Sequence, residues 1–140
     1  MRKVVIDTNI YIDWLNRGLH ADLMTGPGWV RYLSAVVAME LCVGARTAPA
    51  RKAIRKLIRA YDGARRIISP TAVLYQQAGG VLARLDSTGH SIGRAATTHD
   101  VLIALTARAI GATVVTRNAK DFEAIGKVVE IRWEAAGTAK

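Results

Sequence analysis

The chain has 140 residues, of which 51% are hydrophobic, and this combination fits one globular domain rather than a disordered chain. Its longest apolar stretches are interrupted by charged residues, and no secretory signal precedes the first of them, so we expect a soluble cytoplasmic protein. The single cysteine, Cys42, excludes an internal disulfide and a cysteine-based zinc site. The net charge of +9 favours polyanionic partners such as nucleic acid, although a merely basic surface explains it as well.

Strands and helices are expected to alternate along the chain. In chain order we expect strand 3–6, helix 8–17, strand 30–34, helix 35–45, helix 49–62, strand 66–68, helix 71–87, loop 88–96, helix 99–110, strand 112–116 and strand 128–131. This alternation predicts βαβ units with right-handed crossovers and a mostly parallel sheet. We expect a single domain over residues 1–134 and a disordered tail over residues 135–140.

Two acidic residues follow predicted strands. Asp7 ends the apolar run 4–6, and Asp121 comes shortly after the strand 112–116. Because ligands of open parallel sheets bind beyond the carboxyl ends of the strands, the two carboxylates are expected to converge there. Asp7 as a helix cap and Asp121 as an ordinary loop residue are the alternatives.

Two further acidic residues lie in apolar surroundings. Glu40 stands inside the apolar run 35–43, and Asp100 opens an apolar helix. A lone carboxylate in such a place costs several kcal/mol unless it is paired or binds a metal. Glu40 could instead pair with Arg46 or Arg108, and Asp100 could be a simple helix cap.

Explaining all four acids together favours a metal site. Carboxylates that gather at one edge repel each other unless a hard cation lies among them, and oxygen ligands of this kind suit Mg²⁺ or Mn²⁺. Such a metal can polarise a phosphodiester and activate a water for its hydrolysis. The other acids named here are expected to be ordinary surface charges: Asp13, Asp22, Asp62, Asp86 and Glu134.

Four motifs resemble those of PIN domains. Val4-Val5-Ile6-Asp7-Thr8-Asn9 is similar to the opening motif, Met39-Glu40-Leu41 to the segment of the second acid, Asp100 before Leu102-Ile103-Ala104 to the third, and 114–122 to the closing T-x-N-x-x-D-F motif. The spacings are 33 residues from Asp7 to Glu40, 60 to Asp100 and 21 to Asp121, and they agree with compact bacterial members. The resemblance spans residues 3 to about 131 and is nearest to the VapC-type toxins.

This resemblance implies a three-layer, Rossmann-like α/β/α sandwich with a mostly parallel central sheet. It also implies a toxin of a bacterial toxin–antitoxin pair, a metal-dependent endoribonuclease that hydrolyses RNA such as tRNA or rRNA. Asp7, Glu40, Asp100 and Asp121 would be the catalytic and metal-binding acids for Mg²⁺ or Mn²⁺. Thr8, Asn9, Thr116 and Asn118 would support them by hydrogen bonding. A homodimer and a cognate antitoxin that obstructs the metal site would be the partners.

The predicted helix 49–62 is amphipathic and carries a basic face. Arg51, Arg55 and Arg59 could contact RNA phosphates or antitoxin acids, because arginine suits bidentate phosphate contacts. The same face could equally be a solvated surface, and charge patterning does not decide between the two.

Other chemistries fit the sequence less well. A haloacid-dehalogenase-like phosphatase needs an aspartate where Asn9 stands, and a response regulator needs one where Ser69-Pro70 follows the third strand. His99 is expected to be a packing or capping residue, and His20 and His90 loop residues, so no nucleophilic triad competes. A non-catalytic RNA- or protein-binding module with the same fold remains the alternative function.

Overall fold

The computed structural model describes residues 1–137 and contains one five-stranded parallel sheet with the strand order β3-β2-β1-β4-β5. The strands are β1 (Arg2–Ile6), β2 (Trp29–Ser34), β3 (Ile67–Ile68), β4 (Thr113–Thr116) and β5 (Trp133–Ala135). The helices are α1 (Thr8–Arg17), α2 (Ala21–Thr25), α3 (Ala35–Gly44), α4 (Ala48–Gly63), α5 (Ala72–Ser87), α6 (Ala95–Ala109) and α7 (Ala119–Val128).

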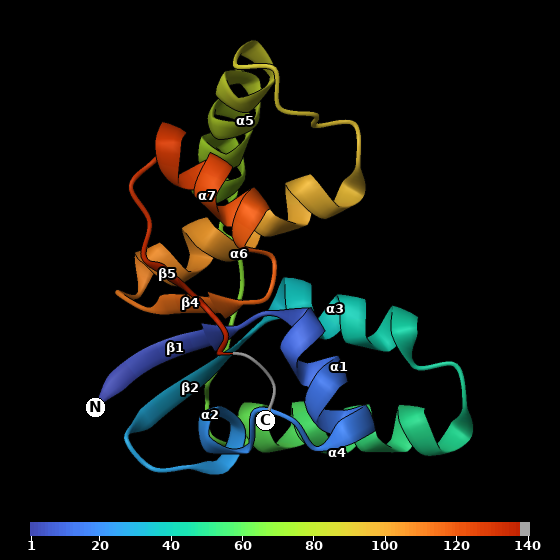
Figure 1. Cartoon of the computed structure of the whole chain (residues 1–140). Coiled ribbons are helices and arrows are strands. Elements are labelled where there is room, and N and C mark those ends of the chain that lie inside the picture. The colour runs from blue at the N-terminus through green and yellow to red at the C-terminus, as the bar shows by residue number, and fades with distance from the viewer. Residues whose placement is uncertain (138–140) are drawn as a thin grey trace.

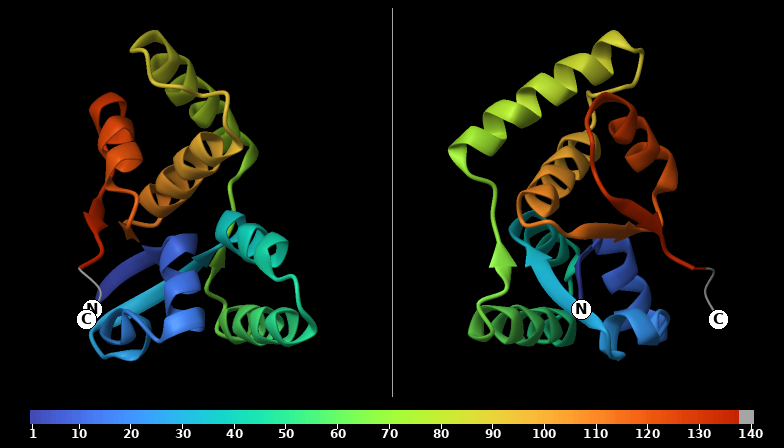
Figure 2. Two further views of the ribbon diagram at one scale, coloured as in Figure 1. Left: turned by 45° about the vertical axis from the view of Figure 1, so that its right-hand side comes forward. Right: turned by 90° about the vertical axis from the view of Figure 1, so that its left-hand side faces the viewer.

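The helices form two layers, one on each face of the sheet. Figures 1 and 2 show α5, α6 and α7 on one side of the strands and α1, α2 and α4 on the other, with α3 at one end of the sheet. The predicted three-layer α/β/α sandwich with a parallel sheet is therefore confirmed. No described helix has the length and apolar character that crossing a bilayer requires.

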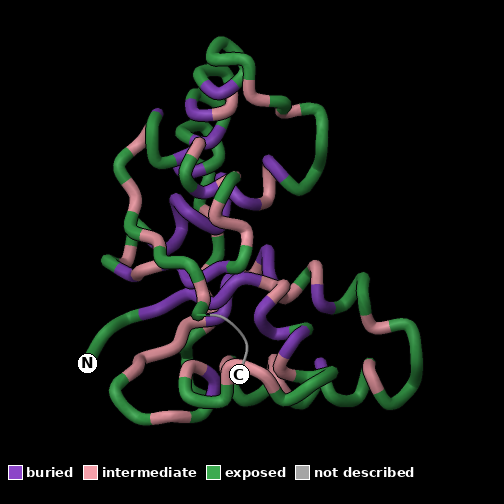
Figure 3. Tube along the Cα trace, in the orientation of Figure 1, coloured by how far each residue is buried: buried purple, intermediate pink, exposed green. Residues whose placement is uncertain are grey.

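The centre of the sheet carries the core. Val4, Val5 and Ile6 of β1 are fully buried, as expected of a strand covered by helices on both faces. Figure 3 shows that the buried segments concentrate in the central strands and in α6, the most deeply buried helix. This rigid centre holds the carboxyl ends of β1 and β4, after which Asp7 and Asn118 lie.

The largest departure from the sequence prediction is near the C-terminus. The predicted strand 128–131 is wrong, because Val128 ends helix α7 and the fifth strand is β5, paired with β4 in the register Val114↔Trp133. Phe122, Ile125 and Val128 recur at helical spacing and are all buried against the core.

The expected domain boundary also falls inside a strand. Ala135 belongs to β5, and the backbone N–H of Ala136 donates to the Thr116 carbonyl at 2.7 Å. The expectation of a disordered tail from residue 135 is thus wrong at its first two residues, and residues 138–140 lie outside the described part of the chain. The helix α2 was not predicted, and α6 starts four residues before the predicted residue 99.

Candidate active site

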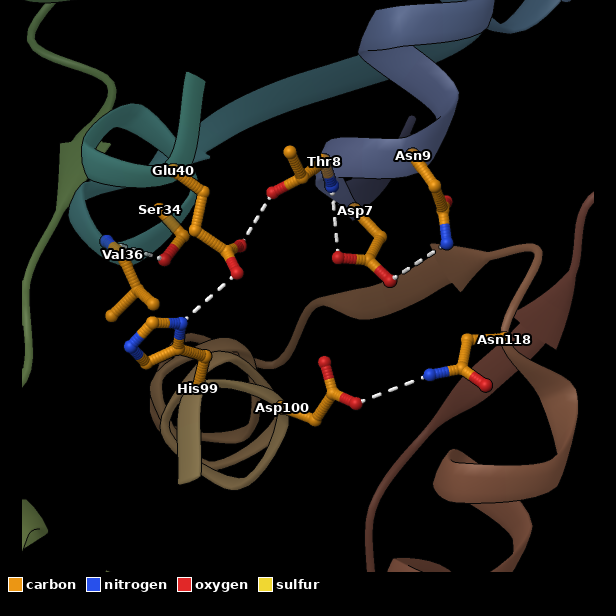
Figure 4. Close-up of polar contacts among 9 residues, drawn as sticks. All are labelled: Asp7, Thr8, Asn9, Ser34, Val36, Glu40, His99, Asp100 and Asn118. Atoms are coloured by element: carbon orange, nitrogen blue, oxygen red, sulfur yellow. Dashed lines mark hydrogen bonds and ion pairs between the residues drawn. The ribbon is translucent and has the colours of Figure 1, made fainter. Parts of the chain in front are cut away.

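Asp7 is held at the junction of β1 and α1. It is the N-cap of α1, as the alternative interpretation proposed, and its Oδ1 accepts from the Thr8 backbone N–H at 2.8 Å. Its Oδ2 accepts from the Thr116 hydroxyl at 2.6 Å and from Asn9 Nδ2 at 3.5 Å. Figure 4 shows the contacts of Asp7 with Thr8 and Asn9. Because the side chain is buried, these contacts and the one to Thr116 of β4 fix one carboxylate orientation.

Glu40 projects from α3 toward the same edge of the sheet. Its Oε1 accepts from the Thr8 hydroxyl at 2.6 Å, and its Oε2 lies 3.0 Å from His99 Nδ1 (Figure 4). About a quarter of the side chain is exposed, so Glu40 is not sealed in an apolar core. Its side-chain partner is therefore His99 rather than Arg46 or Arg108.

Asp100 and Asp121 share one amide. Asn118 Nδ2 donates to Asp100 Oδ2 at 3.3 Å and to Asp121 Oδ2 at 2.7 Å. Asp100 is the sixth residue of α6 and lies well inside it, so the cap interpretation is wrong. Asp121 lies in the first turn of α7, so it is not a loop residue, and the helix dipole favours its charge.

The predicted supporting residues all contribute hydrogen bonds. The Thr116 hydroxyl donates to Asp7 and accepts from the Asn118 backbone N–H at 2.8 Å. Asn9 Oδ1 accepts from the Arg117 backbone N–H at 3.3 Å, which ties α1 to the turn after β4. Hydrogen bonds therefore join the four acids. Thr8 links Glu40 to Asp7, and Thr116 and Asn118 link Asp7 to Asp100 and Asp121. We call these four linked acids the acid row.

The row is electrostatically strained. Burial, followed by the nearby charges of Asp7, Asp121 and Glu40, raises the pKa of Asp100 to about 8, although the hydrogen bond from Asn118 opposes the shift. Burial also raises the pKa of Asp7, although the hydrogen bond from Thr116 lowers it in part. Perturbed carboxyl groups gathered at one sheet edge are typical of functional sites.

A divalent cation fits this row by donor type and charge. The four side chains offer carboxylate oxygens only, which Mg²⁺ and Mn²⁺ prefer, and a cation would relieve the repulsion that raises the Asp100 pKa. As they are placed in residues 1–137, no three acidic, histidine or cysteine side chains close around one point. Glu40 and Asp121 each expose about a quarter of the side chain, so solvent reaches the row at these two acids.

Sequence reasoning missed the partners of these acids. His99 contacts Glu40, and His90 Nε2 lies 3.8 Å from Asp121 Oδ1. Asp13 is not a surface charge, since it is buried and pairs with His20 and Arg117. Each pair joins residues from different elements, and no local sequence pattern indicates such contacts.

The basic helix predicted at 49–62 is α4. Arg51, Arg55 and Arg59 are exposed and form no ion pair within residues 1–137. A groove between α1, α3 and α4 reaches Glu40, but α4 lines it with Ala50, Ala53 and Ile54. At about 100° per residue, the three arginines lie between roughly 110° and 170° around the helix from that groove. They therefore face away from the route to the acid row.

The chain was compared with known families and structures. The model of the PIN domain matches residues 4–128. A VapBC2 structure from Rickettsia felis bound to a promoter DNA fragment is 23% identical over 96% of this chain and 99% of its own, with a TM-score of 0.71. VapBC-1 from nontypeable Haemophilus influenzae is 23% identical over 95% and 97%, with a TM-score of 0.71.

A toxin–antitoxin complex from Klebsiella pneumoniae is 25% identical over 90% of this chain and 95% of its own, with a TM-score of 0.63. The comparison with curated proteins found no match. The structural likenesses support the fold, and the family model covers the four motifs from Asp7 to Asp121. The chain belongs to the PIN-domain family.

Proposed function

We propose that this protein is a VapC-type toxin, a cytoplasmic metal-dependent endoribonuclease. The observation that carries the proposal is the row of four acids, in which like charges and burial raise the pKa of Asp100 to about 8. A scaffold with no need for a cation gains nothing from such repulsion, whereas a phosphodiesterase needs a charged centre for the reacting phosphate. The toxin–antitoxin titles of its structural neighbours support an antitoxin as the partner.

Asp7, Glu40, Asp100 and Asp121 would hold Mg²⁺ or Mn²⁺. When bound, the cation would activate a water and neutralise charge on the phosphate of a tRNA, rRNA or other RNA. Thr116 and the Thr8 N–H fix Asp7, and the Thr8 hydroxyl orients Glu40. Asn118 bridges Asp100 and Asp121 by donating to both. Hydrolysis would leave a 5′-phosphate and a 3′-hydroxyl, and we expect the toxin to act as a homodimer.

The test is cleavage of total cellular RNA, with new 5′ ends mapped by sequencing. The antitoxin-free protein is incubated with Mn²⁺, Mg²⁺ or EDTA. Asp7→Asn is the variant and Asp62→Asn, on the exposed face of α4, is its matched control. We expect discrete cuts that require the metal, persist in Asp62→Asn and vanish in Asp7→Asn. The same cuts in Asp7→Asn would refute the assignment, and no cuts by the wild type would favour a non-catalytic binding module.

A further inference from the structure

A second polar cluster lies beside the acid row. Its centre is Asp13 of α1, whose side chain is 9% exposed. Asp13 Oδ2 lies 2.8 Å from Arg117 Nε and 3.0 Å from His20 Nε2. The hydrogen bond with His20, together with the charge of Arg117, holds the pKa of Asp13 below its usual range. Asp13 therefore stays ionised at neutral pH and anchors Arg117.

The cluster is joined to the acid row through Arg117. This residue stands between Thr116, which contacts Asp7, and Asn118, which contacts Asp100 and Asp121. Its backbone N–H also donates to Asn9 Oδ1. The Arg117 guanidinium is thus placed at the carboxyl edge of β4, next to the acids, by contacts at its backbone and at Nε.

An open cavity of about 440 Å³ lies over this cluster. Its lining includes Asp13, Arg17, His20 and Arg117, together with Ala135 at the end of β5 and residues 136–137 after it. Because β4 and β5 are parallel, residues 136–137 leave the sheet at the edge where the acids lie. An RNA strand that crosses the acid row can therefore continue into this cavity.

The cavity contains hydrogen-bond donors on Arg117 and Arg17 that no described residue accepts from. More than half of the Arg117 side chain is exposed, and its terminal nitrogens have no hydrogen-bond partner within residues 1–137. Arg17 ends α1 and is exposed, and in the described part of the chain its side chain forms neither a hydrogen bond nor an ion pair. With Asp13 ionised, Arg17 and Arg117 leave the cavity with one net positive charge.

We infer that Arg17 and Arg117 bind a backbone phosphate of the RNA strand that flanks the cleaved bond. This inference rests on the proposed function. The acid row repels a polyanion, so a strand that reaches it needs cations close by, and arginine binds phosphate oxygens in a bidentate manner. Asp13 holds Arg117 in place before the strand arrives, which reduces the entropy cost of binding. The arginines of α4 face away from the acid row and therefore do not supply the cations that the RNA strand needs there.

The test measures RNA binding without catalysis. A fluorescein-labelled single-stranded RNA oligonucleotide is titrated with the protein in EDTA, at several salt concentrations, and anisotropy gives Kd. Arg17→Gln is the main variant because the Arg17 side chain has no structural partner, and Arg55→Gln on α4 is the matched control. For Arg17→Gln we expect a Kd about tenfold higher and a log–log salt slope smaller by about 0.7, because one phosphate contact is lost. Arg55→Gln should bind like the wild type.

Arg117 is tested by two variants, since removing its charge leaves Asp13 with His20 alone. Arg117→Lys keeps a positive charge but loses the two parallel N–H donors of the guanidinium. This variant should weaken RNA binding while its Tm stays near that of the wild type. Arg117→Gln should weaken binding further. If Arg17→Gln and Arg117→Lys both bind RNA like the wild type, the inference is overturned. The same holds if a glutamate-rich peptide displaces the RNA at equal concentration, because the cavity then fits an acidic peptide.

Cleavage of the mapped RNA separates this inference from the proposed function. A flanking contact acts equally on substrate and transition state, so Arg17→Gln should raise KM and leave kcat unchanged. Cleavage by the wild type with an unchanged KM in Arg17→Gln would overturn the inference and leave the nuclease intact. Binding that depends on Arg17, with no cleavage by the wild type, would refute the nuclease and support the phosphate contact.

Discussion

Replacing Asp100 with asparagine should stabilise the metal-free protein and abolish RNA cleavage. The Asp100 carboxyl is buried and lies near the charges of Asp7, Asp121 and Glu40, so its ionised form is unfavourable in the folded state. Asparagine has nearly the same shape and can still accept the hydrogen bond from Asn118 Nδ2. The variant removes the repulsion but also a carboxylate that we propose binds the metal.

The pH dependence follows from the direction of the shift. The pKa of Asp100 is about 8 in the folded state, against an ordinary value of 3.8 for an aspartate, so the folded state binds the proton more tightly than the unfolded state does. The wild type therefore loses stability as the pH rises from about 4 to about 8, whereas asparagine does not titrate. At about 1.4 kcal/mol per pKa unit the full shift is worth about 5 to 6 kcal/mol. Relaxation of the partly exposed neighbours reduces this, and we expect about 3 kcal/mol at pH 8.

The assay is thermal unfolding in EDTA at a series of pH values. A gain of about 3 kcal/mol corresponds to a rise in Tm of about 10 °C in a domain of this size. The difference between Asp100→Asn and the wild type should be largest at pH 8 and small near pH 4. Asp86→Asn, at an exposed position of α5, is the control and should show no such trend. An Asp100→Asn protein that is less stable than the wild type at pH 8 would refute the reasoning.

Three further predictions concern single side chains. Thr116→Val removes the hydroxyl that donates to Asp7 Oδ2, so kcat for RNA cleavage should fall about 10- to 100-fold. The circular dichroism spectrum should stay unchanged, and full activity would contradict the role of Thr116. Asp13→Asn loses the ion pairs with His20 and Arg117, so its Tm should lie below that of the wild type at neutral pH. Because the Asp13 pKa is lowered, this gap should close as the pH falls below about 4, and a gap that widens in acid would have the wrong sign. Phe122→Ala empties a fully buried position and should cost about 3 to 5 kcal/mol in urea unfolding, whereas Val43→Ser at an exposed position should cost under about 0.5 kcal/mol.

Local patterns predicted most of the fold. The helix 8–17 agrees with α1 at both ends because Asp7 caps it and Gly18, with φ of 68°, ends it. The segment 128–131 was wrongly predicted as a strand, because the apolar residues Val128, Val129 and Ile131 lie close together as in a buried strand, and helix α7 before it was not predicted. Helix α7 and the pairing of β5 with β4 depend on contacts with the core, for example the aromatic contact between Phe122 of α7 and Trp133 of β5. Sequence spacing alone does not contain those contacts.

The candidate acids were also found from the sequence, because a carboxylate beside an apolar run is conspicuous. The structure brings Asp7, Glu40, Asp100 and Asp121 into one row joined by Thr8, Thr116 and Asn118. The pairs His99 with Glu40 and Asp13 with Arg117 could not be predicted. Their members are 59 and 104 residues apart, and each pair forms only when the strands align α1, α3 and α6 at one edge.

We propose that the acid row binds a divalent metal and that RNA cleavage depends on this metal. The most direct test follows Tm and cleavage of the mapped RNA in the same samples as Mn²⁺ is added to chelator-treated protein. Binding to the folded state alone adds about 2.7 kcal/mol at a hundred times the Kd, so Tm should rise. In the wild type and in Asp62→Asn we expect both signals to rise over one Mn²⁺ range, and in Asp7→Asn neither should rise. Full cleavage without metal, or cleavage restored in Asp7→Asn, would contradict the claim.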